Sequence, residues 1–295
     1  MIKDSNVLLD TPFAAEGKEL AALLKRKAPD EEIQPVIDRI HSEALDQKLD
    51  PLVHSTDVFM TAVCWVGSKS LSHVLACIER TKDRLLDAGA ASEAVRSQII
   101  TAVMTYWSAH PGVAISIVEK LLNYSIITPG SVIDWALVGD KAGPYGEALS
   151  KAWVFELVFN TVVKVTGRLR QVVSTTSSSG NSGVDADAGA EESQQQDQEG
   201  EIAAMRDLFK AMEDALFSWA QGTKDQIMDP VVSDGGEDLI KRWGQRWLRV
   251  FRRRSAIEEA FLVEQKALAA TAAAAAAAAA TAGSTEAADV DVDIS

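Results

Sequence analysis

The residue types that carry catalysis or bind metals are few in this sequence. His73 and Cys77 are four residues apart in a predicted helix, so they share one of its faces. A zinc site needs three or four ligands, and no second pair follows at a zinc-binding spacing. A surface histidine beside a core thiol is the simpler interpretation. We therefore predict no metal site and no cofactor.

Nucleophiles, bases and phosphate-binding loops do not combine into a catalytic pattern either. The stretch GSKS at 67–70 lacks the spacing of a P-loop. His41, His54 and His110 are scattered along the chain, and His110 precedes a proline, as a helix-junction residue would. Because no nucleophile, base and oxyanion donor come together, no catalytic residue is assigned. An enzyme with an unrecognised site stays open as an alternative.

A basic stretch near the C-terminal end interrupts an acidic protein. Its cations are interleaved with Trp243 and Trp247, and comprise Lys241, Arg242, Arg246, Arg249, Arg252, Arg253 and Arg254. The residues from Arg246 to Arg254 are a candidate contact for phosphate or for an acidic partner. In the alternative, which is common for charged helix faces, the tryptophans pack inward and the arginines are solvated. Acidic residues between Glu201 and Asp214 would then neutralise them internally.

Composition limits the class of protein. The 295 residues are 47% hydrophobic and 24% charged, which suffices for a packed core. A net charge of −14 argues against a chain that coats nucleic acid. Two cysteines cannot form a disulfide framework, and the N-terminus lacks the apolar core of a signal peptide. No apolar run reaches membrane-spanning length, so we expect an intracellular protein that binds no membrane.

Helices must position these side chains, and the clearest ones lie between Ser92 and Val138. The first buries a stripe that recurs every four residues, Val95, Ile99, Val103 and Trp107, with Ser92 as its N-cap. Pro111 ends this helix and begins a second one. A short third helix carries Trp135. Turns this short make successive helices pack antiparallel.

The same periodicity predicts helices through most of the remaining chain. They begin near Phe13 and Asp30 and cover Asp57–Val66, Leu71–Leu86, Lys151–Val173, Ile202–Trp219 and Glu237–Ala270. The Lys151–Val173 segment, which contains Trp153, is apolar nearly all round. We prefer a buried helix there, with a buried β-strand as the alternative. Trp107, Pro111, Trp135 and Trp153 are the predicted structural core residues.

A change of composition sets the predicted organisation. Between Ser174 and Gly200 almost no side chain is apolar, so the segment cannot repay the entropy of ordering and is expected to be flexible. The predicted parts are a first helical part at 1–173, a disordered Ser/Gln/acidic insertion at 174–200, C-terminal helices at 201–270 that pack on the same domain, and an Ala-rich and acidic tail at 271–295. The fold class is all-α, with antiparallel helix pairs in a HEAT-like α-solenoid.

Four short motifs between Ser92 and Val138 resemble a known family. They are Tyr106-Trp107, His110-Pro111, Val118-Glu119-Lys120 and Asp134-Trp135. Their order and spacing resemble the third helical-repeat domain, of the middle-domain type, in the large subunit of the nuclear cap-binding complex. The resemblance extends from Asn6 to Val173 and from Ile202 to Leu268. This chain departs from the family in matching only the last of three domains and in replacing a long charged coiled coil by a short insertion.

The resemblance implies a non-catalytic scaffold. In the family, a small subunit with an RNA-recognition motif stacks on the cap of the transcript, and the large subunit holds it in its binding-competent form. Capped RNA is then an indirect partner, the roles are mRNA processing, splicing and export, and the location is the nucleus, with the cytoplasm second. A translation-initiation scaffold of the related middle-domain type, which binds a helicase and RNA, is the other alternative.

Overall fold

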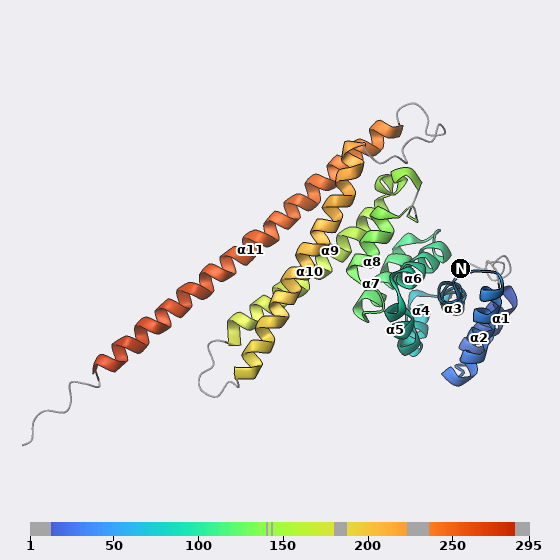
Figure 1. The fold of residues 1–295 in the computed structure, drawn as a ribbon, viewed down its shortest axis with the longest axis horizontal. Helices are drawn as coiled ribbons and strands as arrows, with labels where there is room; N and C mark the ends of the chain where they lie inside the picture. Colours follow the sequence, from blue (N-terminus) through green and yellow to red (C-terminus); the bar gives the residue numbers. More distant parts are fainter. Residues whose placement is uncertain (1–12, 140, 143, 180–187, 223–235, 287–295) are drawn as a thin grey trace, which may run out of the picture. The chain divides into compact units, whose positions relative to one another are not determined.

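The computed structural model describes residues 13–139, 141–142, 144–179, 188–222 and 236–286. All regular elements within these ranges are helical and none is a β-strand, which confirms the all-α prediction (Figure 1). The chain divides into two compact units. Unit 1 consists of Met1–Val163 and Asp214–Gln245, and unit 2 of Lys164–Glu213 and Arg246–Ser295.

Unit 1 begins with a series of short helices joined by tight turns (Figure 1). In chain order they are α1 (Ala14–Lys25), α2 (Asp30–Asp46), α3 (Pro51–Gly67), α4 (Leu71–Arg80), α5 (Lys82–Ala91), α6 (Glu93–Tyr106), α7 (Pro111–Asn123) and α8 (Pro129–Ile133). A π-helical turn, η1 (Asp134–Val138), and a 3-10 helix, η2 (Pro144–Ser150), follow. Chain neighbours such as α1 and α2, or α6 and α7, pack on each other, as helical-repeat pairs must.

Helix α3 is the centre of this series because it is apolar nearly all round. It packs against α1, α2, α4 and α6. Its buried apolar side chains, Val58, Phe59, Met60, Ala62, Val63 and Cys64, point to several of these neighbours. Gly67 ends the helix, and a Cβ atom there would lie 2.3 Å from the Cα of Val74. Only glycine therefore lets α4 approach α3 this closely.

Three long helices complete the fold: α9 (Ala152–Ser179), α10 (Ala188–Gln221) and α11 (Gly236–Glu286). The boundary between the units falls within each of them. In unit 2 their apolar stripes bury Leu169 and Val173 of α9, Met205, Leu208 and Met212 of α10, and Trp247, Leu248 and Phe251 of α11. Because α9 is helical throughout, the strand alternative for residues 151–173 is wrong.

Two predicted helices have different bounds in the structure. Helix α3 begins at Pro51 rather than Asp57, because the Asp50 carboxylate accepts hydrogen bonds from the Leu52 and Val53 amides and proline fits the first turn. The predicted helix from Leu71 to Leu86 is divided at Thr81 into α4 and α5. The Thr81 hydroxyl donates to the carbonyl of Cys77, a local bond that competes with the helix.

The structure assigns helix to parts of the predicted insertion and to the alanine tract of the predicted tail. Residues 174–179 continue α9 and residues 188–200 begin α10, whereas residues 180–187 lie outside the described part. The Glu- and Gln-rich sequence after residue 188 consists of good helix formers, and extending an existing helix needs no new nucleus. Helix α11 continues through the alanine tract to Glu286, and residues 287–295 are not described. The compact units consequently do not follow the predicted boundaries at 173 and 201.

Candidate functional site

The two tryptophans between Ser92 and Val138 lie in the interior of unit 1. Trp107 and Trp135 are 4% and 3% exposed. The Trp135 indole donates a hydrogen bond to the Thr101 hydroxyl at 3.0 Å, and its ring centroid lies 6.3 Å from that of Trp153. Trp153 itself is half-buried, as is Pro111, which occupies the first turn of α7. These residues therefore fix helix packing and leave little aromatic surface for a ligand.

The two cysteines are packed into the same core. Cys64 and Cys77 are both buried and unoxidised. Burial raises the pKa of the Cys64 thiol to about 12, although the neighbouring Trp107 indole opposes part of this rise. His73, by contrast, is exposed at the start of α4, where its ring lies 2.7 Å from the Ser70 hydroxyl. His73 and Cys77 therefore do not converge on one site.

The structure separates the predicted arginine cluster into two groups. Arg252 and Arg254 are held within unit 2. The Arg252 guanidinium donates two hydrogen bonds to the Glu213 carboxylate, at 2.9 and 2.5 Å. The Arg254 guanidinium donates to the Thr166 hydroxyl at 3.0 Å and lies 2.9 Å from the Glu258 carboxylate. Glu258 is completely buried and also accepts a 2.8 Å hydrogen bond from Arg170. These contacts join α11 to α9 and α10.

The second group points away from the packed side of α11. Arg246, Arg249 and Arg253 are exposed, whereas Trp247 is 2% exposed on the opposite side. Within the described part of the chain, Arg249 and Arg253 form no ion pair. The prediction that tryptophans pack inward thus describes Trp247. Arg249 and Arg253 give the outward side of α11 positive charge that no ion pair of the described residues neutralises.

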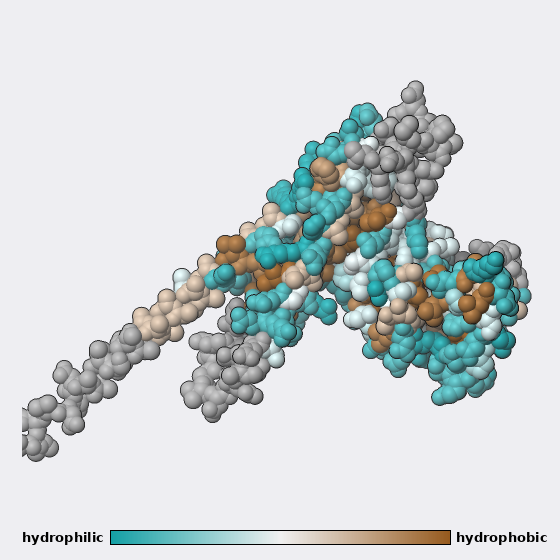
Figure 2. Space-filling view, in the orientation of Figure 1, coloured by the Kyte–Doolittle hydropathy of each residue, from teal (hydrophilic) through white to brown (hydrophobic). Residues whose placement is uncertain are grey.

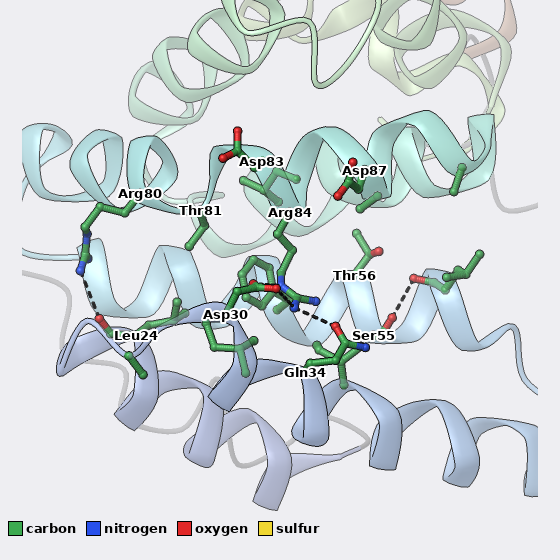
Figure 3. Close-up of a pocket in the computed structure, with 18 of the residues that line it drawn as sticks. Leu24, Asp30, Gln34, Ser55, Thr56, Arg80, Thr81, Asp83, Arg84 and Asp87 are labelled. Carbon is green, nitrogen blue, oxygen red and sulfur yellow. Dashed lines mark hydrogen bonds and ion pairs between the residues drawn. The ribbon is translucent and has the colours of Figure 1, made fainter.

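A polar groove in unit 1 was not predicted from the sequence. It encloses about 730 Å³ between α2 and α5, with α3 as its floor (Figure 3). Arg84 of α5 spans it, binding Asp30 of α2 through two 2.6 Å hydrogen bonds and Gln34 through one of 2.8 Å. Its guanidinium also lies over the ring of Phe59. Arg84 therefore links α5 to α2 through hydrogen bonds.

The groove holds a histidine and a serine in contact, but not as a nucleophile and its base. The Nε2 atom of His41 lies 2.9 Å from the hydroxyl of Ser55, and that hydroxyl donates to the carbonyl of Leu52. A serine that donates to its own helix backbone is not directing its proton to the imidazole. The arrangement is that of a helix-packing contact.

Within the described ranges, no three His, Cys, Asp or Glu side chains gather as metal ligands would. None of the helices there combines the length and the apolar content of a membrane span.

Part of the chain is similar to proteins named nuclear cap-binding protein subunit 1. It is 26% identical over 163 residues to nuclear cap-binding protein subunit 1 of Schizosaccharomyces pombe, covering 55% of this chain and 20% of that protein. The same protein of Caenorhabditis briggsae is 25% identical over 120 residues, covering 41% and 15%. That of Anopheles gambiae is 24% identical over 161 residues, covering 52% and 19%. The chain thus spans at most about a fifth of these relatives.

A family described as MIF4G like matches a much larger share of the chain, residues 8–260. The match covers α1 to α10 and continues into α11 beyond the arginines at 246–254. It covers parts of both compact units, so neither is an unrelated addition to the other. Helical pairs and a core centred on buried tryptophans agree with a helical-repeat architecture. On the extent of this match, the chain belongs to the MIF4G-like family.

Proposed function

We propose that this chain is a non-catalytic scaffold domain of a nuclear cap-binding assembly. The observation that carries the proposal is the family match over residues 8–260, together with the partial similarity to three proteins named nuclear cap-binding protein subunit 1. Its partner would be a small subunit with an RNA-recognition motif, and capped RNA would be bound through that subunit. The processes served would be mRNA processing, splicing and export.

The state of the aromatic side chains supports indirect cap binding. Recognition of a methylated base relies on exposed aromatic rings that stack on it. Four of the seven tryptophans, Trp107, Trp135, Trp219 and Trp247, are at most 4% exposed, and the other three are half-buried. The overall charge of −14 also repels a polyanion at long range. We therefore assign no residue of this chain to the cap itself.

The proposal is tested with the tagged full chain recovered from its source cell. Mass spectrometry of the co-purifying proteins should identify a small subunit with an RNA-recognition motif. Recovery of a helicase without such a subunit would instead favour a translation-initiation scaffold. Retention on immobilised 7-methylguanosine should require the small subunit and be competed by capped, but not by uncapped, oligonucleotide.

The isolated chain provides the complementary experiment. It should bind capped and uncapped RNA weakly and equally at physiological salt, with a steep loss at higher salt if backbone phosphates make the contact. Submicromolar binding with a preference for the capped form, in the absence of a partner, would contradict the scaffold proposal.

A further inference from the structure

The outward side of α11 in unit 2 combines arginines with exposed aliphatic side chains. We name it the α11 seam and define it as Arg246, Val250, Arg253, Ile257 and Ala260. These positions alternate four and three residues apart, so they average 3.5 residues per turn and follow one stripe of the helix. Arg249 flanks the stripe. Figure 2 shows hydrophobic surface in brown between hydrophilic teal stretches along α11, ahead of the paler alanine tract.

Exposure shows that the core of unit 2 does not use this side of the helix. Val250 and Ile257 are 38% and 45% exposed, whereas Phe251 and Glu258, one position further along, are buried. A surface helix normally places polar residues on its outward side. Val250 and Ile257 are β-branched, aliphatic and about two turns apart on that side, and solvation of the helix does not require them there.

The charge on this side is also unbalanced. Elsewhere in unit 2, Arg170, Arg206, Arg252 and Arg254 each pair with a glutamate. Arg249 and Arg253 have no carboxylate partner within the described ranges, and Arg246 is exposed beside them. The seam therefore presents positive charge in a chain whose net charge is −14. A ligand that complements it must carry negative charge.

The side chains around the seam favour a protein ligand over RNA. Single-stranded RNA is held by aromatic rings on which bases stack. Trp247 and Phe251 are buried, and the face of Phe261 is covered by the Arg170 guanidinium 4.6 Å from its centroid. Aliphatic groups at heptad spacing are what a second helix packs against, and the guanidinium fork matches a carboxylate.

We propose that the α11 seam docks an amphipathic helix of acidic character from a partner protein. Apolar side chains of that helix would pack on Val250, Ile257 and Ala260, and its glutamates or aspartates would face Arg246, Arg249 and Arg253. From Arg246 to Ala260 the seam is about 21 Å long at 1.5 Å per residue, which accommodates about four turns. The proposal does not depend on cap binding, because any scaffold of this family could present the seam.

The test uses the full chain and fluorescence anisotropy. The probe is a labelled peptide of about two heptads, which matches the length of the α11 seam, with leucine and isoleucine along one side and glutamate at the flanking positions. A second peptide carries lysine in place of glutamate, and an uncapped RNA oligonucleotide is the third probe. The seam variants are Arg246→Glu/Arg249→Glu/Arg253→Glu and, separately, Ile257→Asp. The charge control is Lys18→Glu/Lys48→Glu/Lys69→Glu, which alters three exposed lysines of unit 1 by the same net charge.

We expect the acidic peptide to bind the unaltered chain and the lysine control with equal affinity. The triple arginine variant should weaken it about tenfold or more and gain affinity for the lysine peptide. Ile257→Asp should weaken it without affecting RNA. Every substituted side chain is exposed, so all variants should fold. Melting curves check that they do.

Three results would overturn the proposal. One is failure of the acidic peptide to bind the unaltered chain. Another is equal loss of binding in the lysine control, because the attraction would then be to net charge alone. The third is RNA binding that is lost in the triple arginine variant while peptide binding persists, which would assign the seam to phosphate.

Discussion

Replacing Glu258 by glutamine should destabilise unit 2 strongly for so small a change. The Glu258 side chain is fully buried on α11 and holds Arg170 of α9 at 2.8 Å and Arg254 at 2.9 Å. Glutamine keeps the volume, so no cavity is created. It removes the negative charge and presents an amide donor where two guanidinium donors already converge. The substitution therefore isolates the electrostatic role of the carboxylate.

The size of the effect follows from the exposure of the partners. Breaking a buried ion pair by removing one member costs about 3–5 kcal/mol. Arg170 and Arg254 keep 40% and 30% of their side chains exposed, so water recovers part of this loss. We expect unfolding free energy to fall by about 2 kcal/mol. At an m value of about 2 kcal/mol per molar urea, the midpoint for unit 2 falls by about 1 M.

Glu259→Gln is the matched control because it alters the next residue in an exposed pair. Glu259 and Arg206 are 38% and 56% exposed, so this loss should be at most about 1 kcal/mol. Urea unfolding followed by circular dichroism measures both variants, and hydrogen exchange at the amides of α9 and α11 assigns the change to unit 2. If Glu258→Gln and Glu259→Gln have the same midpoint, the buried carboxylate does not hold α9 to α11 as argued.

Three further outcomes are expected. Trp107→Ala should lower stability by about 3–5 kcal/mol, read as a clear fall in the melting midpoint, because it removes a buried aromatic; an unchanged midpoint would exclude a core role. Burial, and then repulsion from Glu93, raise the pKa of Asp134, so its ionisation costs stability as pH rises through that value. Asp134→Asn should therefore stabilise the protein at pH 7, by less than about 1 kcal/mol because most of the side chain is exposed. Well below the pKa of Asp134 in the unfolded chain, the substitution should give no benefit, and thermal melts at pH 7 and at such a low pH test this. Neither Cys64 nor Cys77 should react with a thiol reagent at pH 8 until the protein unfolds, given their burial and raised pKa values; fast native labelling would contradict it.

Local sequence signals located most of the helices. Periodic apolar side chains identified α1, α2, α6 and α7, and Ser92 accepts the expected capping hydrogen bond from the Val95 amide. The early start of α3 was also readable, since Asp50-Pro51 is a helix-start signal. Low apolar content predicts disorder, and it therefore does not predict the continuation of α9 and α10 into polar sequence. Helix-forming Glu and Gln residues can extend a helix that is anchored elsewhere.

The ion-pair partners of the arginines depend on tertiary contacts, which local sequence patterns do not predict. The run Arg252-Arg253-Arg254 is uniform in sequence, yet Arg252 binds Glu213 and Arg254 binds the Glu258 network while Arg253 faces outward. The pairing depends on where α9 and α10 lie beside α11. The groove spanned by Arg84 arises in the same way, because Asp30 and Arg84 are 54 residues apart in the chain. No local pattern encodes such a contact.

The alanine tract of α11 makes helix length adjustable. All side chains from 266 to 278 are exposed, so this part of the helix is maintained by the intrinsic propensity of alanine rather than by a core. Adding or losing one alanine would leave the buried residues of both units in place. It would nevertheless shift the part of α11 that follows, up to Glu286, by about 1.5 Å and rotate it by about 100°. Variation in the number of alanines would thus change which direction the end of α11 faces, at little cost in folding.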